Sequence, residues 1–172
     1  MIGTSVTAST RNRQGMYARR DDVATLFIFF GIAFTPVLIG TGFQPDVWYE
    51  SLNKPFWETP RWSFGPVWAV LYTRIGYAGY LAWSSSSGRV RQSAFWIYPA
   101  QLILNALWTP LFFGLSNPGL SLVNISAQWL IILLNIIAFY RIKPAAGILL
   151  IPYFLWVTFA LLLNGTIWSL NR

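Results

Sequence analysis

The sequence predicts an all-α fold, an integral membrane bundle of five transmembrane helices. The first observation behind this class is the composition, because the 172 residues are 55% hydrophobic and only 10% charged, which is too apolar for a soluble domain of this length. The second is that five apolar segments follow one another, each close to the ~20 residues that a helix needs to cross a bilayer. Inside lipid the backbone must satisfy its own hydrogen bonds, so we expect these segments to be helices.

Residues 1–22 form a polar, arginine-rich tail, and residues 23–172 form the membrane domain. The tail has no apolar core of its own and so does not resemble a secretory signal; we expect it to be disordered or to lie on a surface, with a transit peptide as a weaker alternative. The connection at residues 44–62 is long, and the other three connections are short. Short connections predict that consecutive helices are antiparallel neighbours. The five helices are predicted at residues 23–43, 63–83, 94–113, 120–140 and 147–168.

The basic residues predict the orientation of the bundle. By the positive-inside rule, the richer side is cytoplasmic, which places the N-terminus in the cytoplasm and favours a bacterial cell membrane over the alternative, a mitochondrial outer membrane. The net charge of +7 is spread between apolar segments, so it indicates a bilayer with anionic headgroups as partner and no nucleic acid. The tail, second loop and fourth loop carry eight basic residues and the opposite side carries three: Arg11, Arg13, Arg19, Arg20, Arg89, Arg91, Arg141 and Lys143 against Lys54, Arg61 and Arg172.

Cysteine and histidine are both absent from the sequence. Their absence excludes disulfides, thiolate metal sites, histidine general bases, axial histidine ligands to haem and most zinc sites. We therefore predict no metal site, no catalytic residue of the ordinary acid–base kind and no required cofactor.

The most distinctive stretch, residues 48–68, holds four of the ten tryptophans. Pro55 and Pro60 remove amide donors and are predicted to keep this loop out of helix, while Ser63 and Pro66 suit the start of the next helix. From its chemistry alone, the stretch is typical of an aromatic belt at a membrane surface.

Two helices carry stripes of candidate site residues. On the third helix, Gln101, Asn105 and Trp108 fall at steps of four and three and share one face; such amides favour the bundle interior, either as bonds between helices or as a ligand site. On the fifth, Trp156 and Ala160 share a face with Leu163 and Asn164. A large indole beside a small alanine leaves room for a planar guest, although helix packing would explain the same residues.

The polar residues of the second and fourth helices have simpler explanations. Asn124, Gln128 and Asn135 line one face of the fourth helix and are predicted to bond to neighbouring helices. Arg74 lies near the middle of the second helix, where a charge costs at least ~2.5–3.5 kcal/mol. We predict that it bonds to another helix or reaches the membrane surface, and keep as a hypothesis that it pairs with a carboxylate of a bound guest.

Residues 48–68 also carry a sequence pattern, Trp-Tyr-x-x-Leu-x-Lys-Pro-x-Trp-x-x-Pro-Arg-Trp-x-x-x-Pro-Val-Trp. This pattern resembles the signature of the translocator protein family, also called the tryptophan-rich sensory proteins or peripheral-type benzodiazepine receptors. Residues 101–114 and 152–164 are similar to the family as well, so the resemblance extends over residues 24–168 but not over the tail.

The resemblance implies a ligand cavity inside the bundle, closed by a lid. The implied ligands are porphyrins such as protoporphyrin IX and other tetrapyrroles, with benzodiazepine-type drugs as adventitious guests. Sterols are doubtful, since Gly165 stands where a proposed sterol motif has tyrosine. The implied cavity residues are Trp68, Gln101, Asn105, Trp108, Trp156, Ala160 and Leu163, and the implied lid residues are Trp48, Lys54, Pro55, Trp57 and Pro60.

We therefore expect a binding protein that acts as a sensor, carrier or regulator of tetrapyrrole level. One alternative is an enzyme for light- and oxygen-dependent breakdown of protoporphyrin, which would use the photochemistry of the ligand itself. Another is a transporter of porphyrin or lipid, against which stand the absence of an internal repeat and of acidic residues within the five segments. Small residues such as Gly76 and Gly79 permit a homodimer.

Overall fold

The computed structural model describes residues 4–172, with side chains described for residues 22–88 and 94–172. These residues contain helices and no strand, which confirms the all-α class. The backbone of residues 4–22 belongs to a helix, so the expectation of a disordered tail is wrong for these residues, whereas the expectation that the tail lies on a surface stays a prediction. The helices are α1 (Thr4–Gly40), α2 (Val47–Ser51), α3 (Arg61–Ser84), α4 (Gly88–Thr109), a π-helical turn η1 (Pro110–Gly114), α5 (Pro118–Ile142), α6 (Pro144–Leu149) and α7 (Ile151–Leu170).

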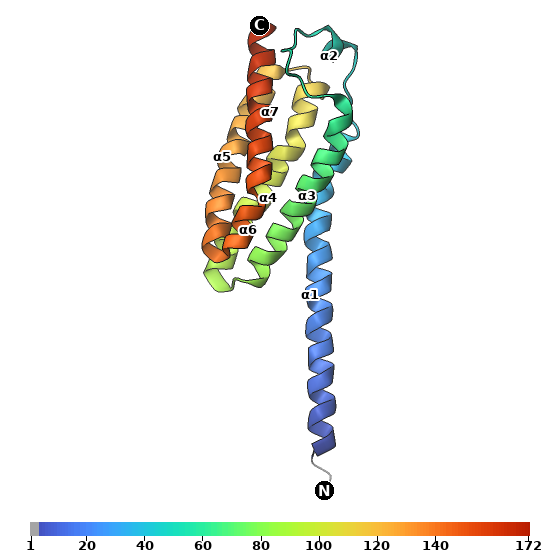
Figure 1. Ribbon diagram of the computed structural model, residues 1–172, viewed down its shortest axis with the longest axis vertical. Helices are drawn as coiled ribbons and strands as arrows, with labels where there is room; N and C mark the ends of the chain where they lie inside the picture. The colour runs from blue at the N-terminus through green and yellow to red at the C-terminus, as the bar shows by residue number, and fades with distance from the viewer. Residues whose placement is uncertain (1–3) are drawn as a thin grey trace.

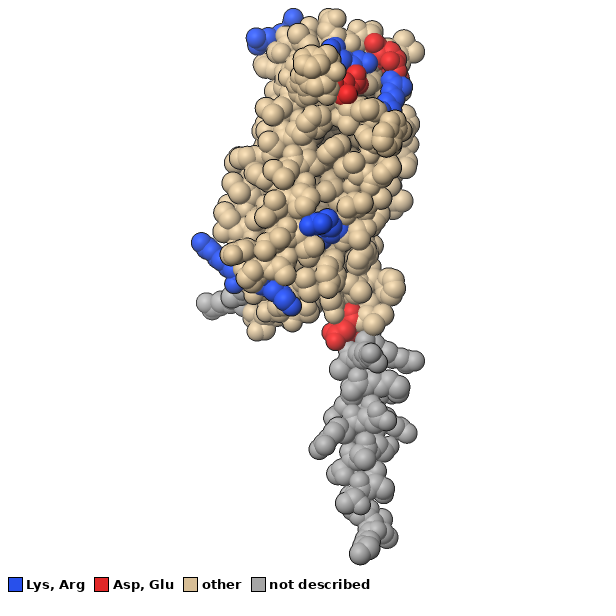
Figure 2. Space-filling view, in the orientation of Figure 1, with Lys and Arg blue, Asp and Glu red and all other residues tan. Residues whose placement is uncertain are grey.

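The long helices lie side by side as one bundle, with the N- and C-termini at opposite ends (Figure 1). Helix α4 packs on α5, α5 packs on α6 and α7, and α1 packs on α3 and α4. The segment with α2 covers the end of the bundle where α7 finishes. On the face shown in Figure 2, most charged side chains gather at the two ends of the body, and the surface between them is almost entirely uncharged.

Three stretches of the described residues are long and apolar enough to cross a membrane: Asp22–Gly40, Pro118–Ile142 and Pro144–Leu170. They correspond to the first, fourth and fifth predicted segments. As far as they are described, helices α3 and α4 are not among the helices that are long and apolar enough to cross a membrane. The predicted number of five transmembrane helices is therefore not confirmed.

The structure differs from the predicted elements at several places. Helix α1 begins at Thr4 and not at residue 23, and helix α4 begins at Gly88 and not at residue 94. The fifth segment is broken at Leu150, because Pro152 has no amide hydrogen to continue the bonding of α6. The loop at 44–62 is also not wholly irregular, since Asp46 caps the short helix α2 by accepting a hydrogen bond from the Tyr49 amide at 3.2 Å.

Gly147 sets how closely α6 approaches α5. A Cβ at this position would lie 2.8 Å from the Cα of Tyr140 and 2.9 Å from the Ile136 carbonyl oxygen, and neither backbone atom can move away cheaply. We expect Gly147→Ala to lower the free energy of unfolding by about 1–3 kcal/mol, measured by denaturant titration in detergent. Gly165→Ala is the matched control, because its Cβ would make only an ordinary 3.7 Å contact with Leu122; equal losses in both variants would contradict the expectation.

Candidate functional site

A cavity of about 600 Å³ lies inside the end of the bundle that the α2 segment covers. Its volume falls within the ~300–1,000 Å³ typical of small-molecule sites. Side chains from α1, α3, α4, η1, α5 and α7 line it, together with part of the loop. Phe64, Gly65 and Ala69 line the cavity and are also exposed, so the cavity opens along this edge of α3.

Helix α3 supplies one aromatic wall. Trp68 and Tyr72 lie one turn apart, and their rings stack with centroids 5.0 Å apart and planes 24° from parallel. Helix α7 supplies another wall through Trp156, whose ring meets Phe64 of α3 edge-on at 6.1 Å. The indoles of Trp68 and Trp156 therefore line the cavity from two different helices.

A buried hydrogen-bond network forms the polar part of the wall. The Tyr72 hydroxyl donates to Oδ1 of Asn105 at 2.7 Å, and Nδ2 of Asn105 donates to the Tyr153 hydroxyl at 3.3 Å. Gln128 donates to the same hydroxyl at 2.9 Å. The network joins α3, α4, α5 and α7. An amide has two N–H groups and two lone pairs on its oxygen, so Asn105 retains capacity for a guest.

Asn164 fixes the neighbouring tryptophan of α4. Its Oδ1 accepts hydrogen bonds from Nε1 of Trp108 and from the Ser121 hydroxyl, both at 3.0 Å, and its Nδ2 donates to the Pro118 carbonyl at 2.8 Å. The Trp108 ring also stacks on Phe112 with centroids 5.0 Å apart. The indole N–H of Trp108 is thus engaged within the protein, and its ring is held as a flat part of the cavity wall.

We define the lid as residues 44–60, the segment that covers the cavity. Within the lid, Tyr49 contacts several other residues. The Tyr49 hydroxyl donates to Glu58 at 2.5 Å, and the Lys54 ammonium lies 4.4 Å from the centroid of the Tyr49 ring. Burial, followed by the hydrogen bond to Glu58, raises the pKa of the Tyr49 hydroxyl above its ordinary value. Glu50 forms ion pairs with Lys54, at 3.8 Å, and with Arg61.

The C-terminal end of α7 holds the lid from outside. The Asn53 amide donates to Oδ1 of Asn171 at 2.9 Å, and Nδ2 of Asn171 donates back to the Asn53 carbonyl at 2.9 Å. These reciprocal bonds join residues 118 positions apart in the chain. The lid is therefore fixed to the helix that carries Trp156.

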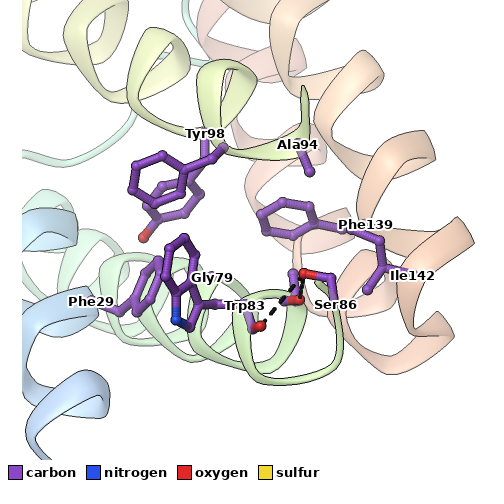
Figure 3. A pocket seen from close by; sticks show the side chains of 10 residues that line it. Phe29, Gly79, Trp83, Ser86, Ala94, Tyr98, Phe139 and Ile142 are labelled. Carbon is purple, nitrogen blue, oxygen red and sulfur yellow. Dashed lines mark hydrogen bonds between the residues drawn. The ribbon is translucent and has the colours of Figure 1, made fainter. Parts of the chain in front are cut away.

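A second hollow, shown in Figure 3, lies toward the opposite end of the bundle from the lid. It is lined by Phe29, Trp83, Tyr98 and Phe139 among others, and its volume of about 10 Å³ is no more than one water needs. The described residues also contain no group of three or more acidic side chains that could hold a metal ion. The large cavity is therefore the candidate site.

The sequence model of the TspO/MBR family matches residues 23–169 of the chain. The chain belongs to the TspO/MBR family. It is 36% identical over 151 residues to the tryptophan-rich sensory protein of Cereibacter sphaeroides, covering 87% of this chain and 93% of that one. It is 36% identical over 146 residues to the translocator protein of Bos taurus, covering 84% and 83%. The tryptophan-rich protein TspO of Archaeoglobus fulgidus is 39% identical over 152 residues, covering 87% and 95%.

Membership of the TspO/MBR family confirms the resemblance found in the sequence, whose range of 24–168 agrees with the matched residues. It also makes the chain an integral membrane protein, in agreement with its apolar helices.

Most of the predicted cavity residues of this TspO/MBR family member do lie on the cavity wall. Gln101 does not: it is fully buried outside the lining, and neither of its amide atoms has a hydrogen-bond partner among the described residues. The six that line the cavity are Trp68, Asn105, Trp108, Trp156, Ala160 and Leu163.

The predicted lid residues lie behind the cavity wall and support it. Trp48 packs edge-on against Phe112 at 5.8 Å, and Trp57 packs against Phe159 at 5.7 Å. The other three act through the loop backbone or Tyr49: the Pro55 carbonyl accepts from the Glu58 amide, the Pro60 carbonyl accepts from Ser63 at the start of α3, and Lys54 lies over the ring of Tyr49.

Arg74 does not line the cavity. Its Nε donates to the Leu149 carbonyl at 3.3 Å, at the break between α6 and α7. The predicted bond to another helix is therefore confirmed, and the pairing of Arg74 with a guest carboxylate stays a hypothesis that the position of Arg74 does not favour.

Other cavity residues on α3 and in the lid were not predicted from the sequence, among them Tyr49, Arg61, Gly65 and Tyr72. A signal for three of them was present, because Arg61, Gly65, Trp68 and Tyr72 follow one another at steps of four, three and four, which places them on one helical face.

Proposed function

We propose that this protein binds planar, mostly apolar molecules inside its bundle, with porphyrins such as protoporphyrin IX as the leading class. The observation that carries the proposal is the cavity of about 600 Å³, whose lining includes Trp68, Trp156 and the amide of Asn105. Flat indole faces suit a planar ring system, and an apolar cavity with few polar groups is how proteins bind such molecules.

The role we propose is that of a sensor, carrier or regulator of tetrapyrrole level. Its support is the family itself, whose members from Cereibacter sphaeroides and Bos taurus are named a sensory protein and a translocator protein. The residues that surround the cavity offer hydrogen bonds and flat surfaces, which are sufficient for binding and release.

We also propose that all five long helical segments span the membrane, with the lid outside a bacterial cell membrane and the N-terminus in the cytoplasm. Arg141 and Lys143 lie at the end of the bundle opposite the lid, where α5 meets α6. The positive-inside rule makes that end cytoplasmic.

The test is a titration of purified protein with protoporphyrin IX in the dark, followed by porphyrin absorbance. We expect saturable binding that Trp156→Ala and Asn105→Ala each weaken tenfold or more, about 1.4 kcal/mol. Trp96→Ala is the matched control, because Trp96 is 78% exposed on α4 and lies outside the cavity. Absorbance is preferable to tryptophan fluorescence, since ten indoles would report any apolar contact.

Thermal unfolding of each variant separates lost contacts from lost structure, which matters most for Asn105 because it belongs to the buried network. Binding that never saturates, or that Trp96→Ala weakens as much as Trp156→Ala, would show that the porphyrin partitions into detergent or onto the outer surface, and the proposal would be wrong.

A further inference from the structure

We propose that Arg61 recognises an acidic group on the edge of the guest, so that the cavity prefers planar molecules with carboxylates along one edge. This inference rests on the proposed function and names the chemistry of the ligand and the residue that selects it. Among the described residues that line the cavity, Arg61 is the one with a basic side chain.

Arg61 stands at the head of the α3 stripe, followed by Gly65, Trp68 and Tyr72. With a rise of ~1.5 Å per residue, Arg61 lies about 10 Å along the helix axis from Trp68 and about 16 Å from Tyr72. The stripe therefore runs from a cation at the cavity edge, past a flat indole, to the hydroxyl that bonds to Asn105. A planar guest on Trp68 would have one edge near the guanidinium and the other near the buried amide.

Gly65 leaves the space between the cation and the indole open. A Cβ at this position would meet no atom within 4 Å. A ring system lying against Trp68 can therefore extend past Gly65 toward Arg61 without displacing a protein side chain.

The present partners of Arg61 can be exchanged for a guest. Its side chain is 58% exposed and pairs with Glu50, which is 54% exposed and does not line the cavity. Such an exposed ion pair contributes little to stability, and a guanidinium has five N–H donors, enough for a second carboxylate. The Tyr49 ring, 6.0 Å from the Arg61 guanidinium, keeps the cation beside the lid.

Glu58 is the acidic side chain among the described residues that line the cavity, and it lies near Arg61, because both contact Tyr49. One of its carboxylate oxygens accepts the hydrogen bond from the Tyr49 hydroxyl. A guest carboxylate is therefore attracted most where it meets the Arg61 guanidinium and stays away from Glu58.

The experiment compares protoporphyrin IX with its dimethyl ester, which has the same ring without the negative charges, by absorbance titration in the dark. The quantity measured is the ratio of the two affinities, so that a general change in folding or detergent partition cancels. We expect Arg61→Gln to lower the acid-to-ester preference about threefold to tenfold. Glu50→Gln is expected to raise the preference, because it removes the competitor for Arg61.

Arg74→Gln is the matched control, since Arg74 is also an arginine of α3 but lies outside the cavity; we expect it to leave the ratio unchanged. The proposal is overturned if Arg61→Gln leaves the ratio unaltered, or if Arg74→Gln lowers it equally. Failure of the proposed function looks different: neither compound would then saturate the wild-type protein, or neither affinity would respond to Trp156→Ala.

Discussion

Gly65→Leu is expected to weaken porphyrin binding at least thirtyfold, about 2 kcal/mol, while the protein stays folded. Gly65 lines the cavity between Arg61 and Trp68, and a side chain added there would meet no protein atom within 4 Å of its Cβ. Leucine would occupy the space that a ring system on Trp68 needs. Because glycine is the poorer helix former by up to about 1 kcal/mol, the substitution is not expected to lower stability.

The control is Gly31→Leu on α1. A Cβ at Gly31 also meets nothing within 4 Å, but Gly31 is exposed and lies outside the cavity. Both variants are titrated with protoporphyrin IX in the dark, and their unfolding midpoints are compared with the wild type. Unchanged affinity in Gly65→Leu would mean that the guest does not use this part of α3, and the proposed orientation on Trp68 would have to be abandoned.

Much of the cavity wall could be predicted from the sequence because its residues are rare types at helical spacings. Asn105 and Trp108 lie one turn apart on α4, and Trp156 and Ala160 lie one turn apart on α7. The family resemblance then indicated that these stripes face a ligand. The same reasoning predicted Gln101 on the cavity wall together with Asn105. Helical spacing indicates which face of a helix a residue lies on, but not how far along the helix a cavity extends. Gln101 lies beyond that end.

The position of Arg61 on the cavity wall was missed, although its spacing to Gly65 and Trp68 is helical, because the predicted helix begins two residues later than α3 does. Ser63 and Pro66 predict a helix start at residue 63, which places Arg61 in the loop at the membrane surface. In the structure α3 begins at Arg61, and the Pro60 carbonyl accepts hydrogen bonds from the amide and the hydroxyl of Ser63. Because α3 includes Arg61 and Trp62, the guanidinium of Arg61 lies on the same helical face as Trp68. The hydropathy of the sequence does not indicate that these two residues are helical.

The buried polar residues show why composition alone cannot separate stabilising amides from costly ones. Asn135 and Asn164 are the same residue type, and each has 1% of its surface exposed. Asn164 has three hydrogen bonds that join α4, α5 and α7. Neither amide atom of Asn135 has a partner among the described residues, so the prediction that it bonds to a neighbouring helix is wrong, whereas Asn124 and Gln128 do make such bonds.

We therefore expect the change from asparagine to leucine to have opposite effects on the free energy of unfolding at the two positions. Asn164→Leu removes three interhelical bonds and leaves the buried indole N–H of Trp108 without its partner, while Ser121 keeps its hydrogen bond to the Pro118 carbonyl, so we expect the free energy of unfolding to fall by about 2–4 kcal/mol. Asn135→Leu replaces an unpaired amide by an apolar side chain of similar shape, and we expect the same quantity to rise by about 1 kcal/mol. Reversible unfolding in mixed detergent measures both. A loss of stability in Asn135→Leu comparable to that in Asn164→Leu would show that Asn135 has a partner, because an amide without one has no hydrogen bond to lose.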